Sequence, residues 1–176
     1  MQAPLLTSDI PADPTGWWLS IKMDGCRAIW TGTRLLSRHG RQFAAPQWFT
    51  AGLPAHRMDG ELWMGNGAFG ELVGAIQRKG SDWRGVRFMV FDLAEAGTFE
   101  ERTVRLANIP LPPHVHRVHH RLCAGNADLD ATERAVVGAG GEGLVLRRPG
   151  CPYRPGRIGD VVKVKRLSID IERWQG

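Results

Sequence analysis

The sequence lacks any apolar run long enough to span a membrane, and its first 13 residues show no basic start followed by an apolar stretch. We therefore expect neither a membrane helix nor a secretion signal, and we expect a cytoplasmic protein. Cysteine is also scarce. Cys26, Cys123 and Cys151 are odd in number and have no CxxC spacing, which argues against a zinc site and favours free thiols in a reducing compartment.

The 176 residues, 43% of them hydrophobic and 23% charged, fit a globular protein of one domain, or of one domain with a small appendage. A net charge of +5 and an isoelectric point near 9.6 favour polyanionic partners, nucleic acid first. Simple solubility explains so modest an excess equally well. The basic residues gather in three groups, at 34–41, 78–87 and 147–166, and the last group is the densest.

Short apolar and aromatic runs between turn signals predict strands, and apolar residues at helical spacing predict helices. The expected strands are 17–23, 27–31, 34–38, 57–64, 86–93, 143–148 and 161–165, with an edge strand at 114–120. The expected helices are 69–78, 99–108 and 129–138, with a short one at 167–174. The first three strands are typical of an antiparallel meander that turns at Asp24-Gly25. The predicted fold class is α+β, with mostly antiparallel sheets and helices packed on them.

The motif with the most chemical content is Lys22-Met23-Asp24-Gly25-Cys26-Arg27. A lysine amine attacks only when neutral, and the ordinary lysine pKa of about 10.4 leaves about one amine in a thousand neutral near pH 7.4. Nearby positive charge reduces this deficit. Lys163 and Lys165 alternate with Val162 and Val164, so both lysines are expected on one face of a strand. The sequence thus predicts a basic strand that lines the pocket of a nucleophilic lysine.

Attack of a lysine on an α-phosphate expels pyrophosphate through a transition state rich in negative charge, which cations stabilise. The candidate cations are Arg27, Arg38, Lys163 and Lys165. Magnesium takes hard oxygen ligands, and Glu61 and Glu142 are the carboxylates expected to supply them. Asp59 and Glu61 lie two apart on one strand, so their side chains face one way. Phe91, at the end of an apolar strand, is expected to stack on a purine base.

In their order along the chain, these motifs resemble those of the covalent nucleotidyltransferases, namely DNA ligases, RNA ligases and mRNA capping enzymes. The correspondence covers KxDGxR (22–27), SRxG (37–40), DGEL (59–62), the segment with the adenine-stacking aromatic residue (88–93), EGLVxR (142–147) and KxK (163–165). Six ordered motifs are far more specific than any single one. Segments 34–54 and 86–102 look most similar to the small ATP-dependent DNA ligases of Gram-negative bacteria.

The resemblance implies an ATP-dependent DNA ligase with two antiparallel β-sheets flanked by helices, in which Lys22 takes AMP from ATP and passes it to the 5′-phosphate of a nick. The implied catalytic residues are Lys22, Asp24, Arg27, Lys163 and Lys165. The implied nucleotide contacts are Ser20, Ile21, Lys22, Arg27, Arg38, Glu61, Phe91, Lys163 and Lys165. Glu61 and Glu142 would hold Mg²⁺ or Mn²⁺. The residues expected to contact DNA are Arg38, Arg41, Arg147 and Arg166. Many relatives carry an acidic or amide residue where this chain has Ser20, so GTP stays open as the nucleotide.

Only 11 residues follow Lys165, whereas the ligases continue there into an OB-fold domain. We therefore expect residues 1–176 to form a single adenylation domain without an OB fold. The expected partners of this monomer are nicked double-stranded DNA and an OB-fold or other DNA-binding protein in trans, with no membrane.

Two alternatives stay open. One is an RNA ligase or guanylyltransferase of the same superfamily, and the other is a nucleotide- or DNA-end-binding module without turnover. The histidines at 114, 116, 119 and 120 look like a metal cluster, but no suitably spaced carboxylate or cysteine accompanies them. A solvated loop or edge strand is therefore the favoured interpretation of that segment.

Overall fold

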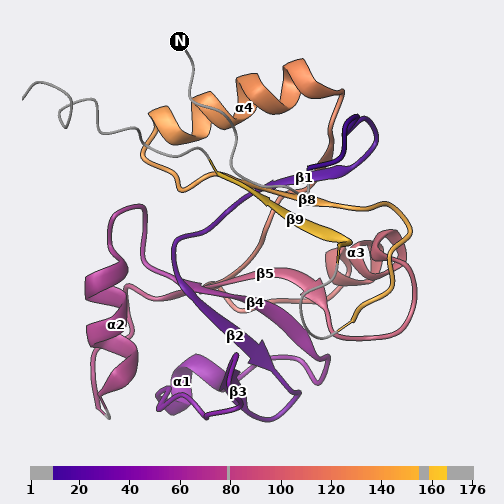
Figure 1. The fold of residues 1–176 in the computed structure, drawn as a ribbon. Coiled ribbons are helices and arrows are strands. Elements are labelled where there is room, and N and C mark those ends of the chain that lie inside the picture. The colour runs from indigo at the N-terminus through magenta and orange to yellow at the C-terminus, as the bar shows by residue number, and fades with distance from the viewer. Residues whose placement is uncertain (1–9, 79, 155–158, 166–176) are drawn as a thin grey trace, which may run out of the picture.

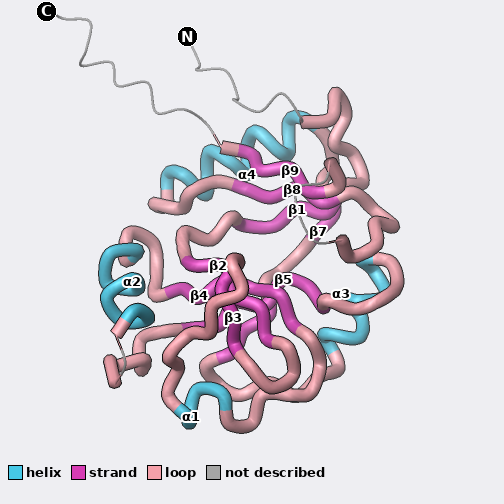
Figure 2. Tube along the Cα trace, turned by 60° about the horizontal axis from the view of Figure 1, so that its bottom comes forward, coloured by secondary structure: helices cyan, strands magenta, loops and turns pink. Residues whose placement is uncertain are grey.

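The computed structural model describes residues 10–78, 80–154 and 159–165, and within these ranges the chain forms two β-sheets and four helices (Figure 1). The sheets lie one above the other, and Figure 2 shows the same two layers from a view turned about the horizontal axis. This arrangement bears out the α+β class with two sheets and flanking helices.

The four-stranded sheet has the order β7-β1-β8-β9, and every neighbouring pair in it is antiparallel. Its strands are β1 (Trp18–Ile21), β7 (Arg121–Leu122), β8 (Leu144–Arg147) and β9 (Val161–Val164). Helix α4 (Asn126–Gly138) covers the outer face of this sheet (Figure 1). The core between them consists of buried apolar side chains, chiefly Leu19, Leu129, Leu144, Leu146, Val162 and Val164. Lys163, between the two valines of β9, is exposed, so the predicted alternation along the last strand is confirmed.

The five-stranded sheet has the order β3-β2-β4-β5-β6. Its strands are β2 (Cys26–Trp30), β3 (Leu35–Ser37), β4 (Met58–Trp63), β5 (Arg87–Leu93) and β6 (Val115–Arg117). The associated helices are α1 (Gln47–Thr50), α2 (Phe69–Gln77) and α3 (Phe99–Ala107). Figure 2 shows α2 and α3 on opposite flanks of the sheet. A second apolar core lies on the face of this sheet that points away from the first sheet, and its largest members are Trp83, Phe49 and Phe88.

A buried ion-pair network ties the two sheets together. Asp92 of β5 accepts hydrogen bonds from Arg102 of α3 (Nε–Oδ1 2.7 Å, Nη2–Oδ2 3.0 Å) and from Arg147 of β8 (Nη1–Oδ2 3.0 Å). Because a buried carboxylate is tolerated only when it is paired and hydrogen-bonded, these contacts fix how the sheets face each other. Each sheet packs one face on its own core, so the side chains on the other face of each sheet meet between the two sheets.

Glycines of two motifs allow the close approach of backbone segments that the site needs. Gly143 has a φ of +147°, which favours glycine, and a Cβ there would overlap the carbonyl oxygen of Val164. The carbonyl of Gly143 accepts a hydrogen bond from the backbone N–H of Lys22 (2.9 Å). A Cβ at Gly25 would likewise overlap the carbonyl oxygen of Leu62 in β4. These glycines let the chain pass tightly from β1 to β2 and fix where the Lys22 side chain begins.

Most of the predicted elements form within a residue or two of their expected ends. The edge strand β6 is also present but ends three residues before its expected end, and α4 begins three residues before its expected start. The expected meander of the first three strands is wrong, because β1 pairs with β7 and β8 while β2 pairs with β3 and β4. Asp24-Gly25 therefore links two sheets and does not form a hairpin. Strand β6 is parallel to β5, the one parallel pair among the described strands. The sequence did not predict α1 or β7, and the expected helix at 167–174 lies outside the described residues.

In the part of the chain that the structure describes, no helix has both the length and the apolar character needed to cross a membrane.

Candidate active site

Lys22 follows β1 directly and forms an ion pair with Glu142, which precedes β8. Lys165, just after β9, lies on the other carboxylate oxygen of Glu142 (Nζ–Oε1 3.4 Å). The side chains of Lys22 and Glu142 are only 18% and 21% exposed. Three motifs that are far apart in the sequence thus converge at one end of the four-stranded sheet. We call Lys22, Glu142 and Lys165 the lysine cluster.

The carboxylate of the lysine cluster is ionised in the free protein. Burial alone would raise the pKa of Glu142, but the hydrogen bond and charge of Lys22, together with Lys165, bring this pKa below its ordinary value. Because only a neutral amine is nucleophilic, Lys22 must leave its ion pair with Glu142 before it can attack.

Glu61 brings a second carboxylate to the cluster from the other sheet. It lies on β4 directly opposite Arg27 of β2. Burial raises the pKa of Glu61 to about 7, and the nearby charge of Asp59 adds to this, although the positive charges of Arg27, Lys22 and Lys163 act in the opposite direction. A carboxylate that burial holds partly protonated near neutral pH is typical of functional sites.

Arg27 is held on the five-stranded sheet by Asp59, whose carboxylate is fully buried (Nε–Oδ1 2.6 Å). The hydroxyl of Tyr153, from the loop between β8 and β9, donates to the same carboxylate (Oη–Oδ2 2.8 Å). The guanidinium of Arg27 lies 4.8 Å from the ring centroid of Phe91. Arg27, Glu61 and Phe91 therefore share one face of the sheet, next to the lysine cluster.

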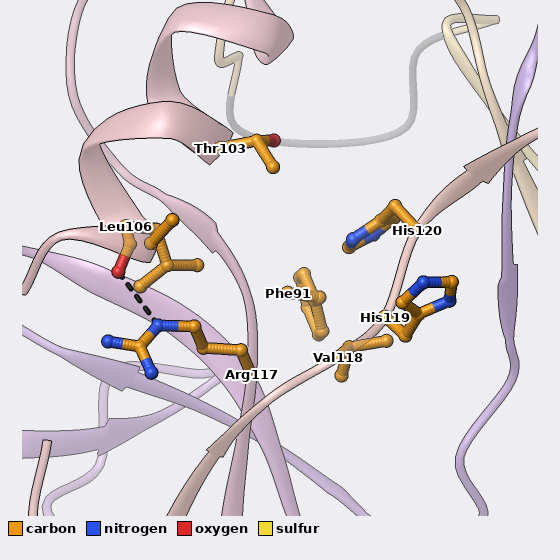
Figure 3. A pocket seen from close by; sticks show the side chains of 8 residues that line it. Phe91, Thr103, Leu106, Arg117, Val118, His119 and His120 are labelled. Carbon is orange, nitrogen blue, oxygen red and sulfur yellow. Dashed lines mark hydrogen bonds between the residues drawn. The ribbon is translucent and has the colours of Figure 1, made fainter.

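Phe91 also lines a cavity of about 260 Å³ between α3 and the segment after β6 (Figure 3). The other lining residues are Thr103, Leu106, Ala107, Arg117, Val118, His119 and His120. In Figure 3, Phe91 lies between the α3 side chains and the two histidines. Burial, and then the charge of Arg147, lowers the pKa of His120 to about 4, so its imidazole is neutral near pH 7. An apolar cavity with a few polar groups suits a flat, uncharged ligand group.

The other predicted site residues lie on β1, in the link between the two sheets and in the turn after β3. Ser20 is buried on β1, and Ile21 beside it is 48% exposed. Arg38 and Arg41 are exposed in the turn after β3. Among the residues that the structure describes, no hydrogen bond or ion pair joins Arg38 to the lysine cluster. Asp24, in the link between the sheets, is half-buried.

Three expectations need correction or restriction. Arg147, which the sequence suggested as a DNA contact, is 9% exposed, pairs with Asp92 and lies with its guanidinium 4.6 Å from the ring centroid of Phe99. It therefore joins the two sheets instead of presenting a charge on the surface. Arg166 lies outside the described residues. His120 is not part of a solvated loop, because its ring packs on Phe99 with centroids 5.0 Å apart and lines the cavity.

Sequence reasoning missed Tyr153 and His120 as members of the site. Tyr153 sits in a Pro/Gly-rich segment that otherwise reads as a plain loop, and its target, Asp59, is distant in the sequence. The only available signal for either residue was composition, since Tyr153 is the single tyrosine of the chain and His120 belongs to a histidine-rich segment.

The carboxylates of the site suit a divalent cation that is shared with phosphate oxygens. No group of three or more His, Cys, Asp or Glu side chains able to hold a metal forms among the described residues. Mg²⁺, however, commonly takes one or two carboxylates and completes its shell with water and substrate phosphates. Glu61 and Glu142, both near Lys22, fit that mode of binding.

Comparison with known proteins agrees with this geometry. No family model matches the sequence. The chain is 31% identical over 155 residues to a DNA ligase of Haemophilus influenzae, an alignment that covers 85% of this chain and 58% of that ligase. A solved structure from a study of Lig E DNA ligases is 32% identical, with a TM-score of 0.85 and coverage of 94% of this chain and 69% of that one. The Chlorella virus DNA ligase-adenylate, 20% identical with a TM-score of 0.77, matches 93% of this chain and 66% of its own.

The fold is therefore the nucleotidyltransferase fold of ligase adenylation domains. The chain belongs to the family of DNA ligases. It spans 58% of the length of the Haemophilus influenzae relative.

Proposed function

We propose that this chain is a DNA ligase adenylation domain that forms a covalent lysyl-AMP intermediate on Lys22. The observation that carries the proposal is the convergence of Lys22, Glu142 and Lys165, with Glu61 and Lys163 close enough to interact electrostatically. The Lys22 amine would lose a proton, leave Glu142 and attack the α-phosphorus of ATP. A nitrogen–phosphorus bond forms, the bond to the bridging oxygen of the β-phosphate breaks, and pyrophosphate leaves.

The remaining site residues would bind and orient the nucleotide. Lys163 and Lys165 supply cations for the phosphates. Arg27 and Arg38 would contact the nucleotide or the DNA 5′-phosphate. Phe91 offers a ring for the purine to stack on, and the neighbouring cavity of about 260 Å³ has room for a base. Backbone groups at Ser20 and Ile21 would read the edge of the base, and Asp24 would support the turn that carries the lysine motif.

Glu61 and Glu142 would hold a Mg²⁺ or Mn²⁺ ion together with phosphate oxygens of ATP. When bound, such an ion neutralises negative charge on the phosphates. Glu142 would also have a second role, because its ion pair with Lys22 holds the lysine side chain before the nucleotide binds.

The full reaction would pass AMP from Lys22 to the 5′-phosphate of a nick in double-stranded DNA and then join it to the 3′-hydroxyl. Arg38, Arg41 and Arg166 are the candidate DNA contacts. Residues 1–176 would form a single adenylation domain that acts as a monomer, with an OB-fold or other DNA-binding protein as a candidate partner in trans. The three cysteines are free, in keeping with the reducing cytoplasm as its location.

Labelling with nucleotides tests the first step. ATP labelled at the α-phosphate should label the wild-type protein, whereas ATP labelled at the γ-phosphate should not. Lys22→Ala should stay unlabelled, while Lys79→Ala, which removes a lysine outside the motifs, should label like the wild type. Equal labelling of Lys22→Ala and wild type would reject the assignment of the nucleophile.

DNA substrates separate the proposal from its alternatives. A nick with a pre-adenylated 5′ end should be sealed without ATP, by way of the same site. Stronger labelling by GTP, or preference for RNA ends, would point instead to a guanylyltransferase or an RNA ligase. Binding of nicked DNA without sealing of either substrate, also after addition of an OB-fold partner, would identify a binding module.

A further inference from the structure

A buried carboxylate determines the position of Arg27. Asp59 is fully buried, and its oxygens accept hydrogen bonds from Arg27 Nε (2.6 Å), Arg27 Nη2 and the hydroxyl of Tyr153 (2.8 Å). The side chain of Arg27, by contrast, is 45% exposed. Its guanidinium is therefore positioned chiefly by the Asp59 carboxylate and by the Phe91 ring 4.8 Å away.

Tyr153 belongs to the other half of the site. It lies in the loop that leads from β8 to the basic strand β9. The same loop is attached to the five-stranded half through the carbonyl of Cys151, which accepts from Arg102 Nη1 (3.1 Å), and through a bridge between Thr98 and Pro152. Among the contacts described for this loop, the hydrogen bond from the Tyr153 hydroxyl is the one that reaches Asp59, the carboxylate that binds Arg27.

We propose that Tyr153 is a positioning residue, which holds the Arg27 guanidinium over the Phe91 ring by way of Asp59. Its consequence for adenylate transfer rests on the proposed function. The positioning itself is a property of the free protein and can be measured without nucleotide.

The hydroxyl matters because two carboxylates compete for one arginine. Arg27 lies opposite Glu61 on the neighbouring strand, and the two side chains attract each other. The Tyr153 hydroxyl donates a hydrogen bond to Asp59 and so helps to hold in place the carboxylate oxygens that bind Arg27. Burial, and then the charge of Asp59, raises the pKa of Tyr153 above its ordinary value, so the phenol keeps the proton that it donates. Without this donor, Arg27 is free to turn toward Glu61.

The first experiment observes Arg27 directly in the free protein. In ¹⁵N NMR spectra of the arginine side chains, the Arg27 Nε–H signal is identified by its loss in Arg27→Lys. Tyr153→Phe should accelerate solvent exchange of this proton by about tenfold, the effect of one hydrogen bond to a charged group. Ser81→Ala removes a hydroxyl that donates a hydrogen bond to the backbone carbonyl of Arg78, and it should leave the Arg27 signal unchanged. An unaltered Arg27 signal in a folded Tyr153→Phe variant would overturn the proposal.

The second experiment is a double-mutant cycle on the rate of lysyl-AMP formation. Tyr153→Phe should lower kcat/KM for ATP about tenfold in the wild-type background. In the Arg27→Lys background, which lacks the Nε contact, the same change should lower it less than about twofold, since interacting residues are non-additive. Equal losses in both backgrounds would mean that Tyr153 acts through general loop stability, and would also overturn the proposal.

The two experiments fail in distinguishable ways. If the wild type forms no adenylate, the proposed function fails while the NMR experiment still decides the role of Tyr153. If the wild type is adenylated but the Arg27 signal is indifferent to Tyr153→Phe, the positioning proposal fails and the proposed function stands.

Discussion

Substitution of Glu61 by glutamine should stabilise the free protein at neutral pH while it damages the site. Glutamine has nearly the same shape as glutamate and resembles its neutral form. Burial raises the pKa of Glu61 from an ordinary value of 4.5 to about 7, which means that the folded protein resists ionisation of this carboxyl. Glu61→Gln removes that resistance.

The magnitude follows from proton linkage. Below about pH 4.5 the carboxyl is protonated in both states and the substitution changes little. Between about pH 4.5 and 7 the unfolded chain releases the proton while the folded protein keeps it, so stability falls as the pH rises. Well above pH 7 the loss is complete and amounts to roughly 3 kcal/mol, because one pKa unit corresponds to about 1.4 kcal/mol.

Thermal unfolding in the presence of a chelator measures the effect. For a chain of this length 1 kcal/mol shifts Tm by about 2–4 °C, so Glu61→Gln should melt up to about 6–12 °C above the wild type near pH 8 and level with it near pH 4. Glu71→Gln provides the control. It removes an exposed carboxylate from the first turn of α2, where negative charge is favourable, and so should lose a little stability near pH 8.

A Tm difference between Glu61→Gln and wild type that is the same at both pH values would refute the reasoning. So would a loss of stability near pH 8, since it would mean that the charges of Arg27, Lys22 and Lys163 outweigh burial. If the site acts as proposed, the stabilised variant should also show greatly reduced labelling by ATP.

Gly143→Ala should lower the free energy of unfolding in urea by about 2 kcal/mol or more, because residue 143 has a positive φ and a Cβ there would overlap the Val164 carbonyl. Gly74→Ala should raise the free energy of unfolding by about 0.5–1 kcal/mol, because Gly74 lies in α2 with open space around it. Equal effects of the two changes would contradict this account. Arg147→Ala should cost about 2 kcal/mol of stability, because it removes one partner of the buried Asp92 carboxylate. Arg41→Ala changes an exposed residue and should leave stability unchanged. If Arg41 contacts DNA, the same change should reduce the salt dependence of DNA binding by about one ion. A stable Arg147→Ala variant with weakened DNA binding would reverse these two roles. The absorbance of phenolate should show the single tyrosine titrating above about pH 10, and stability should fall as the pH rises through that range in the wild type but not in Tyr153→Phe. Titration of the folded protein at or below pH 10 would show that Asp59 does not hold the phenol.

Local patterns predicted the elements of the fold well, because apolar periodicity reflects which side of a strand or helix is buried. The alternation in β9 placed Val162 and Val164 in the core and Lys163 outside. Pairing was harder. Asp24-Gly25 has the sequence of a hairpin turn, yet the strands on either side join different sheets, since β1 finds its partners in β7 and β8 far along the chain.

The sequence by itself determined the chemical groups of the site and their order, because the ligase motifs specify residue types at short spacings. It predicted Lys22, Glu61, Glu142 and the basic pair Lys163 and Lys165 as site residues without any coordinates. Only the tertiary structure decided which charges meet. It paired Lys22 with Glu142, placed both Arg27 and the Tyr153 hydroxyl on the Asp59 carboxylate, and buried Arg147 against Asp92. The reason is physical: local periodicity records how each strand is buried, whereas the pairing of charges depends on how two sheets face each other across long sequence separations.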